Sequence, residues 1–191
     1  MSFRHIIAIM KKRNKTKFVI LGLLTIAPLS GYGIKSLIDK SITYFWSESN
    51  GQIYPTLNLL LKEKLIILKE RQSVGKKIRN IYTITKQGTI ELKKWLNTLA
   101  EKNIHRDETL LKLFFGGASS IKESIKHLQT RKKEIEKNLK NYHLIQKMIQ
   151  TQEDSPHNIY WLICLRNGLI SAKADLKWCK ESIKTLEEHK Q

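Results

Sequence analysis

The sequence has few cysteines and few acidic residues for its 191 residues. The two cysteines, Cys164 and Cys179, lie fifteen residues apart in a segment that we expect to be one helix. At 1.5 Å per residue they would be roughly 22 Å apart, too far for a disulfide bond. The lack of a disulfide framework fits a reducing compartment, so we expect a cytoplasmic protein.

No apolar run suggests a membrane segment. The run at residues 18–29 is too short to cross a bilayer, which needs about 20 apolar residues. Basic residues precede it, as in a signal peptide, but no Ala-x-Ala cleavage pattern follows and the basic stretch begins only at Lys11. We therefore interpret the run as part of a buried helix and expect no membrane partner.

Motifs that would indicate catalysis or metal binding are also missing. The sequence contains no G-x-S-x-G and no H-E-x-x-H, and its six histidines lack metal-ligand spacing. Residues 31–33 begin a dinucleotide-binding fingerprint, but Ser36 stands where the third glycine belongs and no strand is expected before it. We expect no enzyme, no cofactor and no metal site.

What the sequence has in excess is positive charge. Lysine and arginine number 35 against 17 acidic residues, giving a formal net charge of +18. The excess is uneven, because residues 1–100 hold 18 basic and 5 acidic residues whereas residues 101–191 hold 17 and 12. A basic N-terminal half suggests a polyanionic partner such as nucleic acid, although a merely solubilising charge is the alternative.

Hydrophobic periodicity predicts three short helices in the N-terminal half. Pro28 would end the first, and Ser49 with Gln52 has the spacing of a capping box that opens the third. The expected helices are residues 15–27, a short segment after Ser30, and residues 49–64.

A β-hairpin should follow these helices. Residues 65–71 and 78–85 are strand-like, and the turn between them contains Gly75. Three helices followed by a hairpin with a basic tip describe a winged helix-turn-helix, which we place at residues 14–100 behind a basic arm at residues 1–13. The expected fold class is therefore mainly α with a small β-hairpin wing.

The third expected helix contains two residues that helices disfavour. In a helix interior Gly51 and Pro55 would cost about 1 and about 3 kcal/mol relative to alanine. At 100° per residue both fall on the side opposite the apolar residues, on a face without a carboxylate. This outward face presents Gly51, Pro55, Asn58, Leu59 and Lys62, flanked by Gln52 and Tyr54.

This outward face has the chemistry of a DNA-reading helix. Asparagine and glutamine amides can bind adenine edges in the major groove, and a glycine lets the backbone approach its neighbour closely. The hairpin places Lys76, Lys77 and Arg79 around a glycine tip, an arrangement that suits phosphates beside the groove. The alternative is a surface helix with an incidental glycine and proline.

The C-terminal half is expected to be helical throughout. A long helix should begin after Ser120 and end near Gln150, and the last helix should begin after Ser155-Pro156. In the last helix, apolar residues recur at alternating spacings of three and four, which implies left-handed helix pairing. We interpret these as a dimer interface, with a core inside one chain as the alternative: Leu162, Leu165, Leu169, Ala172, Leu176, Cys179 and Ile183, with Leu186 continuing the pattern.

Several segments resemble the PadR-like family of transcriptional regulators. The resemblance lies in ILGLL…PLSGYGIKSLI, in FWSESNGQIYPTL, in LLKEKLI and in GKKIRNIYTITKQG, the second being the most specific. RDETLLKLFFGG and the last two helices are similar to the α-helical C-terminal domain of the longer members. The resemblance spans about residues 18–188.

The resemblance implies a dimeric, sequence-specific regulator of double-stranded DNA. It implies a repressor that binds an inverted repeat, with residues 101–191 mediating dimerisation and a small aromatic or lipophilic effector as a further expectation. A non-specific nucleic-acid-binding protein and a protein-interaction module are the alternatives. The residues that the resemblance places at DNA are Tyr32, Ser49, Gly51, Gln52, Tyr54, Lys76 and Arg79.

Two departures from the family pattern are informative. Asn58 and Leu59 stand where the family usually has one or two basic residues, so the resemblance implies the class of DNA-binding protein but does not fix the operator sequence. Lys64 replaces a glycine before the first wing strand, and a left-handed conformation there would cost about 1 kcal/mol.

Eight aromatic residues are either effector-pocket walls or plain core: Tyr44, Phe45, Trp46, Phe114, Phe115, Tyr160, Trp161 and Trp178.

Overall fold

The computed structural model describes residues 15–74, 77–102, 106–151 and 155–189. The chain divides into two compact units, Met1–Glu101 and Lys102–Gln191. Within the described ranges, none of the helices combines the length and the hydrophobicity that crossing a membrane requires.

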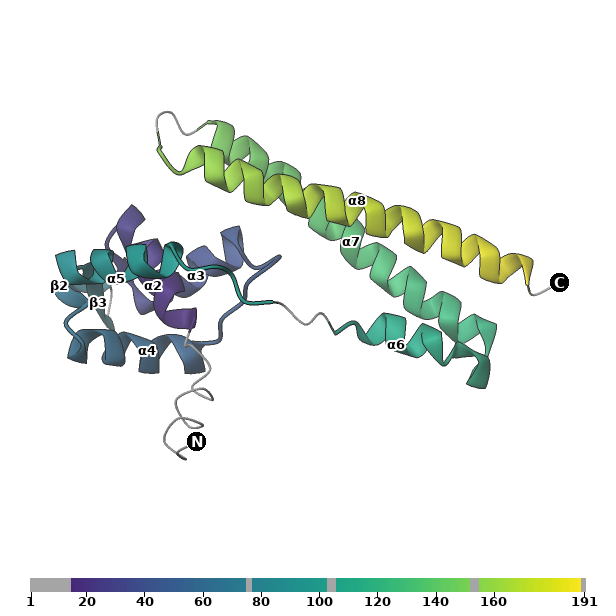
Figure 1. The fold of residues 1–191 in the computed structure, drawn as a ribbon, viewed down its shortest axis with the longest axis horizontal. Helices are drawn as coiled ribbons and strands as arrows, with labels where there is room; N and C mark the ends of the chain where they lie inside the picture. Colours follow the sequence, from purple (N-terminus) through teal and green to yellow (C-terminus); the bar gives the residue numbers. More distant parts are fainter. Residues whose placement is uncertain (1–14, 75–76, 103–105, 152–154, 190–191) are drawn as a thin grey trace. The chain divides into compact units, whose positions relative to one another are not determined.

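The described part of the first unit contains four helices and a small antiparallel sheet (Figure 1). The sheet has the strand order β1-β3-β2, so β3 is its central strand. The helices are α2 (Lys15–Ile26), α3 (Gly31–Ser41), α4 (Asn50–Lys62) and α5 (Lys86–Leu96), and the strands are β1 (Leu29–Ser30), β2 (Ile66–Val74) and β3 (Lys77–Ile84).

The predicted helices and hairpin are confirmed, and their local causes are visible. α2 ends two residues before Pro28, and the Ser30 hydroxyl accepts a hydrogen bond from the Gly33 N–H at 3.0 Å at the start of α3. β1 was not predicted; its two residues pair with Ile81 and Tyr82 of β3. Two residues are too few to show a strand period.

The core of the first unit lies between α2, α3, α4 and the base of the hairpin. The middle of the run interpreted as a buried helix is buried, since Ile20 and Leu21 are inaccessible to solvent, whereas residues 25–28 are exposed. At the edge of this core, Phe18 stacks on Trp95 with ring centres 4.6 Å apart. The fully buried residues are Ile20, Leu21, Ile34, Ile38, Ile53, Leu57, Leu60 and Ile66.

Lys17 joins the end of α4 to α5. Its ammonium lies 3.0 Å from the Glu63 carboxylate and 3.2 Å from that of Glu91. Burial alone would lower the pKa of Lys17, but hydrogen bonds and charge from the two carboxylates outweigh burial and raise the pKa above its ordinary value. The pair of bridges fixes the C-terminal end of the α4 helix against the rest of the unit.

Lys64, between α4 and β2, has a φ of 57°, so the left-handed conformation whose cost was considered above is present. Lys64→Gly is expected to raise the free energy of unfolding by about 1 kcal/mol, because glycine adopts this conformation without a Cβ clash. Lys62→Gly is the control: it makes the same change at the last residue of α4, which has a helical conformation, and should lower stability by up to about 1 kcal/mol. Urea unfolding measures both, and equal signs would contradict the strain at Lys64.

The second unit is an α-helical hairpin with a short preceding helix. α6 (Glu108–Phe114) is followed by a 3-10 turn, η1 (Gly116–Ala118), and then by α7 (Ile121–Gln150) and α8 (Asn158–Glu188). Figure 1 shows α7 and α8 lying side by side, antiparallel, along most of their length. Ser120 opens α7 as predicted, since its hydroxyl accepts from the Glu123 N–H at 3.2 Å.

The apolar side of α8 that we assigned to a dimer interface packs within the chain. Leu165 and Cys179 are 1% and 0% exposed in the single chain. Cys179 lies in one cluster with Leu128 and Ile135 of α7, and the members packed around it include Ala172, Leu176 and Ile183. The 3.5-residue repeat correctly indicated helix pairing, and α7 of the same chain is one partner of α8.

The assignment of these residues to an intermolecular interface stays a prediction, because the structure describes a single chain. Leu165 and Cys179 are buried within the hairpin, whereas the other five are half-buried: Leu162, Leu169, Ala172, Leu176 and Ile183. A second copy can therefore cover the remaining surface of these five side chains as well as the exposed side chains of this unit.

Candidate nucleic-acid interface

The N-terminus of α4 is held by a capping box, as the sequence predicted. The Ser49 N–H and the Ser49 hydroxyl each donate to Oε1 of Gln52 at 2.9 Å. These bonds occupy the oxygen of the Gln52 amide and leave its nitrogen to act as a donor. Gln52 is therefore both part of the cap of α4 and able to donate a hydrogen bond to a partner outside the protein.

One side of α4 is packed and the other is open. Ile53, Leu57 and Leu60 are buried, and the Thr56 hydroxyl is also buried and donates to the Gln52 carbonyl at 2.7 Å. The residues of the predicted outward face are all exposed: Gly51, Gln52, Tyr54, Pro55, Asn58, Leu59 and Lys62. Their exposure leaves the face available, and their contact with DNA stays a prediction.

Nothing inside the unit requires a glycine at position 51. A Cβ placed there would meet only the Ser49 hydroxyl, at 3.7 Å, and the φ of Gly51 lies outside the left-handed region. Alanine would therefore fit the folded chain without strain. Any reason for glycine at this position therefore lies outside the described part of the unit.

Tyr32 and Arg79 come together although they are far apart in the sequence. The guanidinium carbon of Arg79, on β3, lies 5.2 Å from the ring centre of Tyr32, at the start of α3. Such cation–π contacts contribute about 0.5–1 kcal/mol at exposed sites. Tyr32 is 63% exposed, so the pair joins the wing to α3 and still offers an aromatic edge and a cation to a ligand.

Tyr54 extends this patch onto α4. A Cβ on Gly31 would lie only 2.7 Å from Cε1 of Tyr54, so the glycine allows the start of α3 to approach the α4 aromatic ring. Tyr54 keeps 49% of its surface exposed. The residues from α3, α4 and β3 thus form one surface, which we call the tyrosine-arginine patch: Tyr32, Tyr54 and Arg79.

The tip of the wing is only partly described. Lys76 lies outside the described residues. Lys77 is described as the first residue of β3, pairing with Val74, but its side chain is not among those described. Of the three predicted wing cations, the structure therefore positions the side chain of Arg79.

Glu48, immediately before the α4 cap, is a functional candidate that the sequence analysis missed. It is 5% exposed, and its two carboxylate oxygens accept from the Thr16 hydroxyl at 2.9 Å and from the Trp46 indole N–H at 2.7 Å. These bonds tie the first turn of α2 and the preceding loop to the start of α4. The one sequence feature that could have drawn attention to Glu48 is the small number of acidic residues in residues 1–100.

Removing one donor from Glu48 should be costly. Thr16→Val keeps the side-chain shape but leaves a buried carboxylate oxygen without its partner, so the free energy of unfolding is expected to fall by about 1–3 kcal/mol. The control is Thr25→Val, because the exposed Thr25 hydroxyl bonds only to the Gly22 carbonyl of its own helix. Urea unfolding should show less than about 0.5 kcal/mol for the control. Equal losses in both would contradict the positioning role of Glu48.

In the second unit, Arg131 joins all three helices. Its guanidinium donates to Asp107, the N-cap of α6, and to Asp175 of α8 at 2.8 Å, and it lies 5.3 Å from the ring centre of Trp178. The hydrogen bond from Arg131 holds the pKa of Asp107 below its ordinary value. This cluster fastens α6 to the hairpin.

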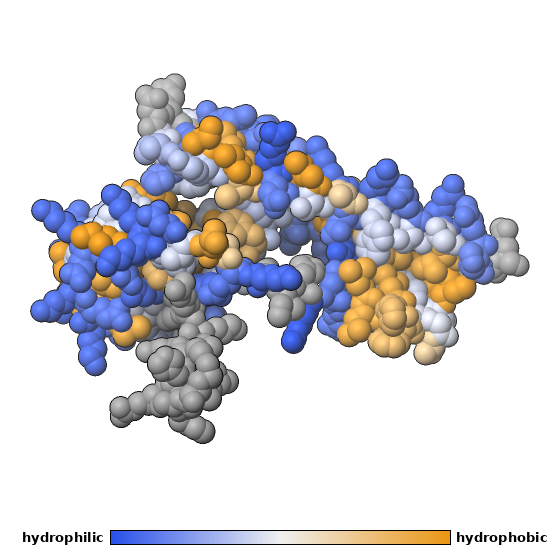
Figure 2. All heavy atoms as spheres, in the orientation of Figure 1, coloured by the Kyte–Doolittle hydropathy of each residue, from blue (hydrophilic) through white to orange (hydrophobic). Residues whose placement is uncertain are grey.

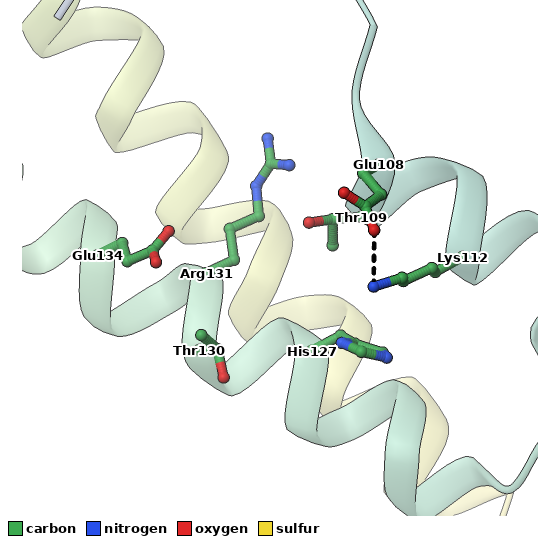
Figure 3. Close-up of a pocket in the computed structure, with 7 residues that line it drawn as sticks. All are labelled: Glu108, Thr109, Lys112, His127, Thr130, Arg131 and Glu134. Carbon is green, nitrogen blue, oxygen red and sulfur yellow. Dashed lines mark ion pairs between the residues drawn. The ribbon is translucent and has the colours of Figure 1, made fainter.

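A polar cavity of about 340 Å³ lies beside this cluster, between α6 and α7 (Figure 3). Glu108 and Lys112 of α6 pair across one wall at 2.8 Å, and Arg131 and His127 come from α7. None of the eight candidate pocket aromatics lines it. Among the described residues, no group of histidine, cysteine or carboxylate side chains is arranged to hold a metal ion.

Three helices followed by a hairpin wing, with an exposed face on the third, define a winged helix-turn-helix of the DNA-binding class. Family models agree with this assignment. The model of the transcriptional regulator PadR-like family matches residues 20–94, and that of the virulence activator alpha C-terminal domain matches residues 105–187. The predicted resemblance to the PadR-like family of transcriptional regulators is therefore confirmed.

Individual relatives support the same family. The negative transcriptional regulator PadR of Bacillus subtilis is 36% identical over 111 residues, which cover 56% of this chain and 60% of that protein, less than two thirds of its length. The PadR-like regulator BC1756 from Bacillus cereus has a similar structure, with a TM-score of 0.78, 28% identity, and coverage of 92% of this chain and 99% of that one.

Two structures of Bacillus subtilis PadR itself are similar to this chain. The complex with operator DNA gives a TM-score of 0.76 at 28% identity and covers 89% of this chain and 98% of that chain. The complex with p-coumaric acid gives a TM-score of 0.71 at 26% identity and covers 93% of this chain and 98% of that chain.

Proposed function

We propose that this protein is a sequence-specific transcriptional repressor that binds an inverted-repeat operator as a homodimer. The exposed face of α4 lies in the major groove of each half-site, and the wing lies against the flanking phosphates. The observation that carries the proposal is the α4 face itself, which is exposed, lacks a carboxylate and adjoins the tyrosine-arginine patch. Since DNA is the partner, the cytoplasm is the expected location.

The relatives support this choice of partner. Bacillus subtilis PadR is described as a negative regulator and has been solved with operator DNA. Asn58 and the amide nitrogen of Gln52 supply the base-reading groups in this chain, and Arg79 supplies a phosphate contact. A dimer would place two such faces on the two halves of a palindrome.

A small aromatic effector is part of the same proposal. Bacillus subtilis PadR has been solved with p-coumaric acid, an aromatic carboxylic acid. In this chain the aromatic residues of the second unit are accessible to such a compound, because Phe114, Phe115 and Tyr160 are more than half exposed. Binding near residues that also contact a second copy would couple the effector to the dimer.

The test separates contacts to bases from contacts to phosphates. Arg79→Ala is expected to weaken binding to all duplexes alike and to reduce the slope of log K against log salt by about 1. Asn58→Ala should instead reduce discrimination between the operator and unrelated DNA by roughly 1–3 kcal/mol. Footprinting of the neighbouring promoter identifies the operator, and salt titrations measure both variants.

The same experiment decides between the proposal and its alternatives. Protection of a defined palindrome supports the repressor. Protection without sequence preference, with equal losses for the two variants, would favour a non-specific nucleic-acid-binding protein, which the basic first half alone could explain. No protection at any salt concentration would favour a protein-interaction module.

A further inference from the structure

One face of α7 carries lysines and no carboxylate. At 100° per residue six exposed lysines fall within an arc of about 80°, and they extend over roughly 37 Å of helix. Gln129 and Leu144 share this arc. We call the set the lysine row: Lys122, Lys126, Lys133, Lys137, Lys140 and Lys147.

The lysine row is not explained by the packing of the hairpin. The residues of α7 that are buried include Leu128, Ile135 and Tyr142, and their side of the helix lies about 150° around from the row. Among the described residues, the one ion pair that involves the row joins Lys126 to Glu123 at 3.5 Å. The nearest other carboxylate, Glu136, is half-buried and lies just outside the arc.

The row also costs helix stability. Lys122 and Lys126, and likewise Lys133 and Lys137, are four residues apart, where like charges destabilise a helix by about 0.2–0.5 kcal/mol per pair. Two exposed lysines of α8 are paired with carboxylates of the same helix, Lys177 with Glu181 and Lys184 with Glu188, each at 3.8 Å. Along the lysine row, the described residues show such a pair only at Lys126.

We propose that the lysine row is a second, sequence-independent surface for duplex DNA, separate from the operator-reading face of the first unit. Its length is about that of one turn of the double helix, roughly 34–36 Å. The lysine ammonium is a point charge that can bind backbone phosphates without reading the base sequence. A lipid surface is disfavoured because the apolar side of α7 is buried against α8 and cannot insert.

The experiment compares two triple variants of the full chain. Lys133→Gln, Lys137→Gln and Lys140→Gln alter the row, whereas Lys177→Gln, Lys180→Gln and Lys184→Gln remove the same charge from α8. Binding to a random-sequence duplex of about 40 base pairs is titrated with salt, and circular dichroism checks the helices. The row variant is expected to flatten the slope of log K against log salt by up to about 2.7, with affinity at 0.1 M salt falling about tenfold or more.

The control triple should change the slope by less than about 1, because two of its three lysines already pair with carboxylates. Equal slopes for the two triples would reduce the effect to net charge and overturn the inference. The inference would also be overturned by a row variant that keeps the parent's slope of log K against log salt for DNA but loses binding to phosphatidylglycerol vesicles. Operator footprinting separates this inference from the proposed function, since the row variant should still protect the operator. If the parent protein protects no operator, binding to the random-sequence duplex still tests the lysine row.

Discussion

Phe114→Glu combined with Phe115→Glu is expected to dissociate the proposed dimer while leaving the helices intact. Phe114 and Phe115 are 82% and 62% exposed and meet edge to face with ring centres 5.0 Å apart. Leu110 and Leu111 are also exposed on α6, and Figure 2 shows apolar atoms gathered over this helix. An exposed cluster of this kind marks an interaction surface, and a second copy is the partner that the proposed function requires.

The consequence for DNA binding should be large. A monomer engages one half-site, so it loses the gain of linked binding, which commonly amounts to 10²–10⁴-fold. Operator affinity is therefore expected to fall by about 100-fold or more in the double variant. Light scattering measures the oligomeric state, and circular dichroism measures the helix content. A dimer that persists in this variant would place the interface elsewhere.

Leu165→Glu is the control, because it introduces the same type of side chain at a buried position of the same unit. Leu165 is 1% exposed, and an uncompensated buried charge should lower stability by about 3 kcal/mol or more. The hairpin is expected to melt in this variant, with loss of helical signal. The contrast distinguishes loss of an interface from loss of the fold.

For the residues of α8 predicted to form a dimer interface, the sequence alone did not identify the partner helix. A 3.5-residue repeat in α8 requires a partner helix with a matching apolar side, and α7 supplies one through Leu128 and Ile135. The repeat itself does not say whether that partner lies in the same chain. The exposed residues of α6 gave no comparable signal, because a seven-residue helix is too short to show a sustained period.

In the first unit the predictable features were those with local causes. Pro28, the caps at Ser30 and Ser49, and the left-handed residue at Lys64 depend on the chain within a few positions of each. Glu48 was missed because one of its donors, Thr16, lies 32 residues away. The contact between Tyr32 and Arg79 is likewise made only when β3 folds back against α3.

Gln52 illustrates a residue whose two roles the sequence could not separate. Its spacing from Ser49 predicted a cap, and its place on α4 suggested base reading. The structure shows its oxygen engaged with Ser49, so Gln52 offers a base only its amide nitrogen. Asn58, without such a cap bond, is the more independent reader of bases, which is why the proposed test uses Asn58 and not Gln52.

Gly51→Ala is expected to raise stability and to weaken operator binding in the same protein. Alanine should gain up to about 1 kcal/mol of helix stability, since the added Cβ meets only the Ser49 hydroxyl at 3.7 Å. If the α4 backbone lies against DNA at this point, the same methyl group occupies space that the DNA needs. We expect operator affinity to fall about tenfold, equivalent to about 1.4 kcal/mol.

Gly22→Ala supplies the control for this pair of effects. Gly22 lies inside α2, and a Cβ there would have nothing within 4 Å, so stability should rise by a similar amount. Its operator affinity should equal that of the parent, because α2 is not part of the proposed DNA surface. Thermal melts and operator titrations measure both variants. If Gly51→Ala behaved like Gly22→Ala in both measurements, the glycine would not mark a close approach of the helix to DNA, and the docking of α4 proposed above would have to be abandoned.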